Sequence, residues 1–192
     1  MFFYLKLHVI LNKVKININS EVLMEIERKF LVNLDNIKDI ITNNEYVRKD
    51  ITQDYLYFDK FTAIRKRKIV YNNTEEKYYY TIKTGHKGLS TNEIEHEISL
   101  NEYNELDVNI NYHTLSKTRI IYPYIDNLKV EIDIFKGEYN GLIFAEIEFP
   151  SEEDAKNIKL PDFFDKELTN KITNAEMATM KYIDVMNIIN NA

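Results

Sequence analysis

Apolar and polar residues alternate along much of the first 150 positions of this chain, which is typical of half-buried β-strands. In the clearest stretch, Glu25, Glu27 and Lys29 are two residues apart, with Ile26 and Phe30 at the alternate positions. Side chains two apart point to the same side of an extended strand. The pattern therefore predicts a strand with one charged face and one apolar face.

Extended patterns of this kind recur along the chain and are separated by polar or glycine-containing turns. The polar residues 72–74 predict a hairpin turn, and so do residues 137–141, which begin and end with glycine. The further strands are predicted over residues 46–58, 63–71, 77–83, 93–100, 112–124, 129–135 and 142–149. Short connections between successive strands indicate a mostly antiparallel sheet.

Helical spacing of apolar residues occurs in four places. Residues 35–44 predict a short helix with Asp35 as its N-cap, and residues 101–108 predict a second. Ser151 is expected to cap an acidic helix, and a final long helix is expected to begin at Asn174 or Ala175 and to extend through Ile188. Strands come first and the longest helix last, so the expected fold class is α+β.

Composition and net charge limit the classes of partner and metal ligand that the chain can have. The 192 residues fit one domain, and the net charge of −6 disfavours a general surface for a nucleic acid duplex. A polyanion would need locally concentrated Lys and Arg. The chain contains no cysteine, so only oxygen and histidine ligands remain for a metal, and a cytoplasmic location is expected.

The start of the chain is expected to lie outside the functional domain. The apolar stretch 2–10 is too short to span a bilayer and lacks the features of a signal peptide, so no membrane association is predicted. Met24 directly precedes the first charged strand. We therefore predict a single domain over residues 24–192 and an N-terminal extension over residues 1–23, which is either an over-called start or a peripheral strand.

The charges on these strand faces need compensation. Taken alone, each strand fits an open sheet with a solvated polar face. Carboxylates gathered from several strands would repel one another unless cations or a metal lay between them. The chain supplies such cations on other strands, including Arg65 and Arg67. A closed β-barrel with a charged interior and helices outside satisfies both strand faces.

These residues resemble the CYTH superfamily of triphosphate tunnel metalloenzymes, whose N-terminal hallmark is Glu-x-Glu-x-Lys. Here that motif is Glu25, Glu27 and Lys29. The resemblance continues in order through most of the chain from Met24 to the final helix. Its further segments are residues 53–56, 64–67, 80–83, 88–95, 117–119, 130–135 and 145–149.

The resemblance implies an eight-stranded antiparallel tunnel that holds a triphosphate between a basic wall and an acidic wall. Arg can grip phosphate oxygens with two donors, and Lys adds charge. Carboxylates favour a hard cation, Mg²⁺ or Mn²⁺. The implied triphosphate ligands are Lys29, Arg65, Arg67, Lys83, Lys117 and Arg119. The implied metal ligands are Glu25, Glu27, Asp133, Glu146 and Glu148.

Hydrolysis would need an in-line water, which Glu25, Glu27 or Glu146 would position, with Glu27 as the named candidate. Similarity to the short bacterial inorganic triphosphatases suggests that Lys29 and Tyr55 act together in catalysis. The alternative is that Tyr55 packs as an ordinary strand aromatic and Lys29 only binds phosphate. Three further tunnel carboxylates are expected to neutralise the basic wall: Glu93, Glu95 and Glu131. The chain departs from the family pattern at Thr91 and Ile172, which puts the grip on substrate or specificity at the tunnel mouth in doubt.

The expected reaction is metal-dependent hydrolysis of inorganic triphosphate to diphosphate and phosphate, extending to nucleoside triphosphates. An adenylate cyclase of the family's class IV type, a thiamine triphosphatase and a non-enzymatic polyphosphate-binding module are the alternatives. The expected partner is a small polyphosphate, with neither a nucleic acid duplex nor a membrane. Whether the protein forms a homodimer is left open.

Overall fold

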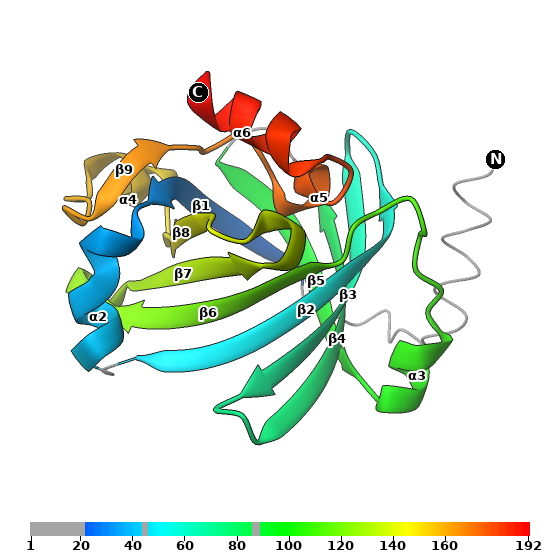
Figure 1. The fold of residues 1–192 in the computed structure, drawn as a ribbon. Helices are drawn as coiled ribbons and strands as arrows, with labels where there is room; N and C mark the ends of the chain where they lie inside the picture. Colours follow the sequence, from blue (N-terminus) through cyan, green and yellow to red (C-terminus); the bar gives the residue numbers. More distant parts are fainter. Residues whose placement is uncertain (1–21, 44–45, 86–88) are drawn as a thin grey trace.

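A computed structural model describes residues 22–43, 46–85 and 89–192, and its centre is a closed antiparallel β-barrel (Figure 1). The strands follow the order β5-β4-β3-β2-β6-β7-β8-β1, and β1 closes the barrel by pairing with β5. The predicted eight-stranded barrel is confirmed. Its strands are β1 (Leu23–Val32), β2 (Val47–Phe58), β3 (Thr62–Tyr71), β4 (Glu75–Thr84), β5 (Ser90–Ile98), β6 (Leu115–Pro123), β7 (Lys129–Lys136) and β8 (Ile143–Glu148).

Both predicted hairpin turns are present. Asn72 and Asn73 join β3 to β4 with φ angles of 47° and 62°, a left-handed conformation that Asn tolerates better than most residues. The connection between β7 and β8 contains the 3₁₀ turn η3 (Gly137–Tyr139), and Gly137 and Gly141 have φ angles of 64° and 95°. These turn residues therefore set the register of the two hairpins.

A ninth strand, β9 (Phe164–Glu167), was not predicted from the sequence. It pairs with β1 at Phe30, Leu31 and Val32, next to the pairing of β1 with β8. With only four residues, two of them exposed, it has too little alternation to stand out in a sequence. β1 begins at Leu23, so the sheet includes the last residue of the expected extension, while residues 1–21 of that extension lie outside the described residues.

The helices are short and lie outside the barrel. They are the 3₁₀ turn η1 (Leu34–Ile37), α2 (Lys38–Asn43), α3 (Leu100–Glu105), the 3₁₀ turn η2 (Ile125–Asn127), α4 (Glu152–Asn157), α5 (Asn174–Met177) and α6 (Tyr182–Asn190). Ser151 caps α4 as predicted. The prediction that Asp35 is the N-cap was wrong. Asn33 holds that position, and its side chain accepts a hydrogen bond from the Asp35 amide at 2.9 Å.

The prediction of a single final helix was also wrong, because the structure has two separate helices there, α5 and α6. Carbonyls at the break accept hydrogen bonds from residues elsewhere in the chain. The Tyr139 hydroxyl donates to the Met180 carbonyl at 2.7 Å, and the His113 amide donates to the Ala178 carbonyl at 2.7 Å. A carbonyl with an external donor no longer needs the next helical turn.

Apolar residues fill the outside of the barrel and one of its ends. Ile26, Ile132 and Ile147 belong to an outer cluster that extends to Ile37 and Ala155 near α2 and α4. At one end of the barrel, α5 and α6 pack against a second cluster, whereas the β3–β4 hairpin lies at the opposite end (Figure 1). In the part of the chain that the structure describes, no helix is both long and apolar enough to cross a membrane.

Candidate active site

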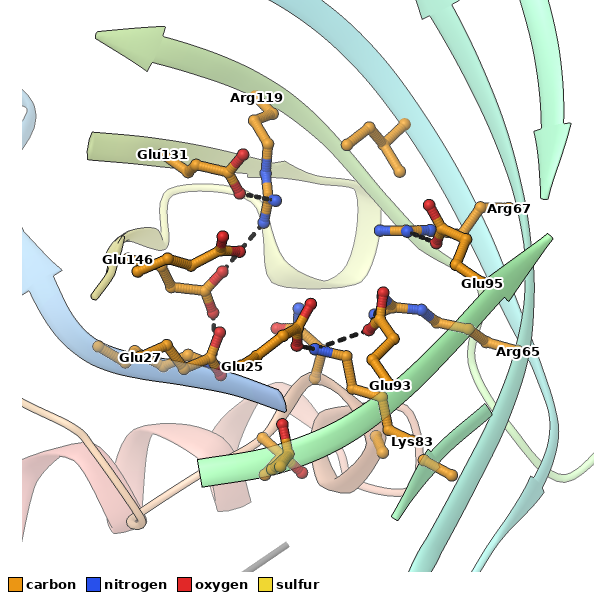
Figure 2. A pocket seen from close by; sticks show the side chains of 18 of the residues that line it. Glu25, Glu27, Arg65, Arg67, Lys83, Glu93, Glu95, Arg119, Glu131 and Glu146 are labelled. Atoms are coloured by element: carbon orange, nitrogen blue, oxygen red, sulfur yellow. Dashed lines mark hydrogen bonds and ion pairs between the residues drawn. The ribbon is translucent and has the colours of Figure 1, made fainter. Parts of the chain in front are cut away.

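The barrel encloses a cavity of about 300 Å³ whose lining is rich in charged side chains (Figure 2). Side chains alternate between the two faces of each strand, so every second residue of β1, β3, β5 and β8 points inward. The chain from the end of β9 into α5 closes one end through Leu168, Ile172 and Ala175, which belong to the apolar cluster there. The result is a charged chamber with one closed end.

Most residues predicted for the site meet in this chamber. They come from strands far apart in the sequence, so only the closed barrel brings them together. The predicted residues that line the cavity are Glu25, Glu27, Lys29, Tyr55, Arg65, Arg67, Lys83, Glu93, Glu95, Arg119, Glu131, Glu146 and Glu148.

Lys117 and Asp133 lie behind the cavity wall and do not line it. Each is almost completely buried, and the two form an ion pair. Burial, followed by the nearby Arg119 charge, lowers the pKa of Lys117 to about 8. Arg119 bonds to both Asp133 oxygens at 2.6 Å, so the buried pair supports an arginine that does reach the cavity.

The basic wall is neutralised by carboxylates from β1 and β5 (Figure 2). The Arg65 guanidinium lies 3.5 Å from Glu93, and the Lys83 ammonium lies 2.9 Å from the same carboxylate. Two further ion pairs join Arg67 to Glu95 and Lys83 to Glu25. Glu93 and Glu95 therefore lie against the basic residues, while their role as supporting carboxylates stays a prediction.

The acidic wall contains carboxylates whose charges are poorly compensated. Glu27 and Glu148 are cross-strand neighbours on β1 and β8. Burial and the Glu146 charge raise the pKa of Glu27, while burial, Glu131 and Glu25 raise the pKa of Glu148 to about 7. Carboxylates held together in this way gain from a cation placed between them.

The chemistry of these donors fits a hard divalent cation. Glu25, Glu27, Glu146 and Glu148 all present oxygen ligands to the cavity, as Mg²⁺ and Mn²⁺ prefer. No group of three or more carboxylates or histidines is already arranged as a metal site among the described residues. Glu25 is held by Lys83 and Glu146 by Lys29, so a metal would have to draw these carboxylates away from their lysines.

Lys29 is held by the segment that closes the chamber. Its backbone amide donates to the Thr169 hydroxyl at 3.0 Å, and its carbonyl accepts from the Leu168 amide at 2.7 Å. Its ammonium lies 3.0 Å from Glu146 and 3.5 Å from the Ile172 carbonyl. Although burial opposes the charge, Glu146 and Glu27 raise the pKa of Lys29, so this side chain is a cation here.

Tyr55 also lines the chamber, and Gln53 lies two residues before it on β2. The Gln53 side-chain amide donates to the Tyr55 hydroxyl at 3.1 Å. No hydrogen bond joins Tyr55 to Lys29 among the described contacts. The cooperation of Lys29 and Tyr55 therefore stays a prediction, and so do the catalytic and binding roles of the other site residues.

Several cavity residues carried little signal in the sequence. The Thr91 hydroxyl and the Asn174 side-chain oxygen are buried and have no hydrogen-bond partner among the described residues. Lys49, Tyr71 and Tyr79 line the end of the cavity away from α5. Their inward positions follow from strand alternation, but their place in the cavity depends on barrel closure.

Comparison with known proteins agrees with this geometry. The CYTH domain family model matches residues 23–179. An inorganic triphosphatase from Acetivibrio thermocellus is 36% identical over 146 residues, which cover 76% of this chain and 85% of that protein. An inorganic triphosphatase from Nitrosomonas europaea is 30% identical over 145 residues, covering 76% and 89% of the two chains.

The crystal structure of the inorganic triphosphatase NE1496 superposes with a TM-score of 0.55 at 26% identity, covering 84% of this chain and 98% of that one. Triphosphate tunnel enzymes of the CYTH family are metal-dependent, which agrees with the carboxylate wall. On the match over residues 23–179 and the closed charged barrel, the chain belongs to the CYTH family.

Proposed function

We propose that this protein is a metal-dependent hydrolase that splits inorganic triphosphate into diphosphate and phosphate. One observation carries the proposal: inside a single chamber, cations from five strands face a wall of partly uncompensated carboxylates. A triphosphate supplies anionic oxygens for the first group, and a divalent cation supplies positive charge for the second. The names of the two curated relatives support the same substrate.

Substrate binding would exchange carboxylate partners for phosphate partners. Arg65 and Arg67 can each present two donors to phosphate oxygens, and they now hold Glu93 and Glu95. Lys29, Lys83 and Arg119 add charge from other sides of the chamber. The cations are thus already positioned by ion pairs, which lowers the ordering that binding requires. Lys117 acts from behind, through Asp133 and Arg119.

Glu25, Glu27, Glu146 and Glu148 would hold the metal. Asp133 would hold Arg119 in position from behind the cavity lining. Bound Mg²⁺ or Mn²⁺ would neutralise phosphate charge and orient the triphosphate. The donor set does not distinguish these two ions. Asp133 was predicted from the sequence as a direct metal ligand, but it does not line the cavity.

Hydrolysis requires a water molecule in line with the bond that breaks. The water oxygen bonds to the terminal phosphorus while the bond from that phosphorus to the bridging oxygen breaks, which releases phosphate and diphosphate. Glu27 would take the water proton, because its carboxylate lines the cavity and forms no ion pair among the described residues. Arg65, Arg67 and Lys83 would stabilise the charge that grows on the leaving diphosphate.

Product analysis tests this proposal. The purified protein is incubated with Mg²⁺ or Mn²⁺ and, separately, with tripolyphosphate, ATP and thiamine triphosphate. Phosphate formed chiefly from tripolyphosphate is the expected result. Cyclic AMP together with diphosphate would instead identify a cyclase, and metal-dependent binding without turnover of any of the three would identify a binding protein.

A further inference from the structure

Gln53 places a fully buried amide beside an apolar cluster. It is 0% exposed and lies on β2 between Ile51 and Tyr55, which both line the cavity, so its side chain points to the same face of the strand. Its neighbour on β6 is Leu115, a member of the apolar cluster at the closed end. The Gln53 side-chain oxygen has no hydrogen-bond partner among the described residues. A buried oxygen without a partner lowers the stability of a fold, so stability alone does not explain this residue.

The Gln53 amide holds the Tyr55 hydroxyl from one side. The amide nitrogen donates to the hydroxyl oxygen at 3.1 Å, and in the part of the chain that the structure describes this is the only hydrogen bond of the Tyr55 side chain. A phenol has a single O–H to donate. Because Gln53 is the donor in this contact, the O–H of Tyr55 remains available to an acceptor in the cavity.

The backbone at Tyr55 has less support from the sheet than the backbone before it. The pairing of β2 with β6 ends at Gln53, and the pairing of β2 with β3 shifts register directly after Tyr55. A bulge of this kind bends the strand and changes the direction of a side chain. The hydrogen bond from Gln53 is therefore the polar contact that sets the direction of the Tyr55 hydroxyl.

The available O–H lies beside another unpaired donor on the next strand. Tyr55 and Arg65 are cross-strand neighbours on β2 and β3, and the Cβ atoms of such pairs are roughly 5 Å apart. The Arg65 Nε is buried and lacks a hydrogen-bond partner among the residues described. Two neighbouring donors without acceptors suit an anion with several oxygens, such as the phosphate groups of the proposed substrate.

We infer that Gln53 is a positioning residue that turns the Tyr55 O–H toward the bound triphosphate, so that Tyr55 donates a hydrogen bond to a phosphate oxygen beside Arg65. Gln53 does not touch the substrate, because it does not line the cavity. Tyr55 stabilises negative charge on phosphate in this arrangement and does not take a proton from water. The inference rests on the proposed function, since it assumes that a triphosphate occupies the chamber.

The test is a double-mutant cycle on tripolyphosphate hydrolysis. Gln53→Leu removes the amide and is expected to lower kcat/KM about tenfold, equivalent to about 1.4 kcal/mol. Tyr55→Phe is expected to lose the same factor. The double variant should lose no more than either single variant, because Gln53 acts only through the Tyr55 hydroxyl. The melting temperature of Gln53→Leu should not fall, since the change removes a buried oxygen that has no partner.

A second variant tests the direction of the hydrogen bond. Gln53→Glu keeps the size of the side chain, and Arg67 lies opposite it on β3 to balance the new charge. A carboxylate can only accept, so it would take the Tyr55 O–H away from the substrate and should lower kcat/KM at least as much as Gln53→Leu. Gln53→Glu also replaces Gln53→Leu in the cycle if the latter does not fold. Thr52→Ala, an outward-facing change on the same strand, is the matched control.

Several results would overturn the positioning role. Losses that add in the double variant would show that Gln53 acts without the Tyr55 hydroxyl, and wild-type activity in Gln53→Glu would refute the direction of the hydrogen bond. If the wild type does not hydrolyse tripolyphosphate, the proposed function fails, and the same cycle is measured by calorimetry as affinity for tripolyphosphate. A tenfold loss of affinity that does not add would then support the positioning role, whereas absent or unchanged binding would refute it.

Discussion

Both faces of β1 and β8 carry buried side chains, but the buried residues of the two faces are of opposite types. On β1 and β8, Lys29 and Glu146 are 7% and 8% exposed, and on the outer face Ile26 and Ile147 are 5% and 0% exposed. Burial of the isoleucines stabilises the fold, whereas burial of charges costs desolvation that ion pairs offset only partly. The comparison teaches that the outer face maintains the barrel, whereas the inner face keeps charged groups buried at a cost to stability.

The largest expected effect comes from the inner face. Glu27→Gln should lower kcat for tripolyphosphate by on the order of 1,000-fold, because a neutral amide neither takes a proton nor binds a metal well. Stability should stay the same or rise, since the Glu146 charge and burial already disfavour the Glu27 carboxylate. Steady-state kinetics and thermal unfolding measure the two effects.

Glu152→Gln, on the exposed surface of α4, is the control for this change. Wild-type turnover in Glu27→Gln would contradict its role in catalysis. A fall in activity accompanied by unfolding would instead place Glu27 with the structural residues and remove the contrast between the two faces.

The outer face should show the reverse behaviour. Ile147→Ala removes a fully buried side chain and should lower the free energy of unfolding by about 3 kcal/mol. The kcat of the folded fraction should not change, because Ile147 does not line the cavity. Urea denaturation gives the first value. Reduced kcat in fully folded protein would mean that the two faces are coupled.

A smaller effect is expected at one cation of the basic wall. Arg67→Ala should raise KM for tripolyphosphate about 30-fold, which corresponds to about 2 kcal/mol for charge-assisted hydrogen bonds. Arg67→Ala would leave Glu95 without its ion-pair partner. A double variant, Arg67→Ala with Glu95→Gln, therefore separates the effect on substrate binding from the effect on stability. Arg48→Ala, outside the cavity lining, is the control, and an unchanged KM in the Arg67 variants would remove Arg67 from the substrate contacts.

The smallest effect is expected from removal of the N-terminal residues. Deleting residues 1–22 leaves β1 complete and should change the free energy of unfolding by less than about 0.5 kcal/mol, with no change in kcat/KM. This agrees with the proposal that the functional domain begins near Met24. Loss of activity on truncation would show that the N-terminal segment belongs to the domain.

Strand alternation was sufficient to predict the barrel strands and the charged interior. The period of two fixes which residues share a face, and the turns at Asn72 and Gly137 fix where strands end. Alternation alone did not reveal which inward residues reach the cavity. Lys117 and Asp133 have the same spacing as Arg119 and Glu131, yet they are almost fully buried and do not line the cavity.

Features that depend on distant contacts were not predicted. β9 exists because Phe30 to Val32 offer a pairing edge, and the final helix divides where Tyr139 and His113 bond to its carbonyls. Neither partner can be inferred from residues near the break. Local patterns therefore specified the elements, and tertiary contacts specified their ends.

The position of β1 also affects how the chain acquires its fold. This strand is synthesised first, but its partners include β8 and β9, which follow more than one hundred residues later. Such distant pairings form slowly. Until β8 emerges from the ribosome, the apolar side chains of Ile26 and Phe30 lack their final neighbours, and the barrel has open edges that are prone to aggregation. Closure of the barrel by β1 is therefore the step at which a nascent chain most needs protection.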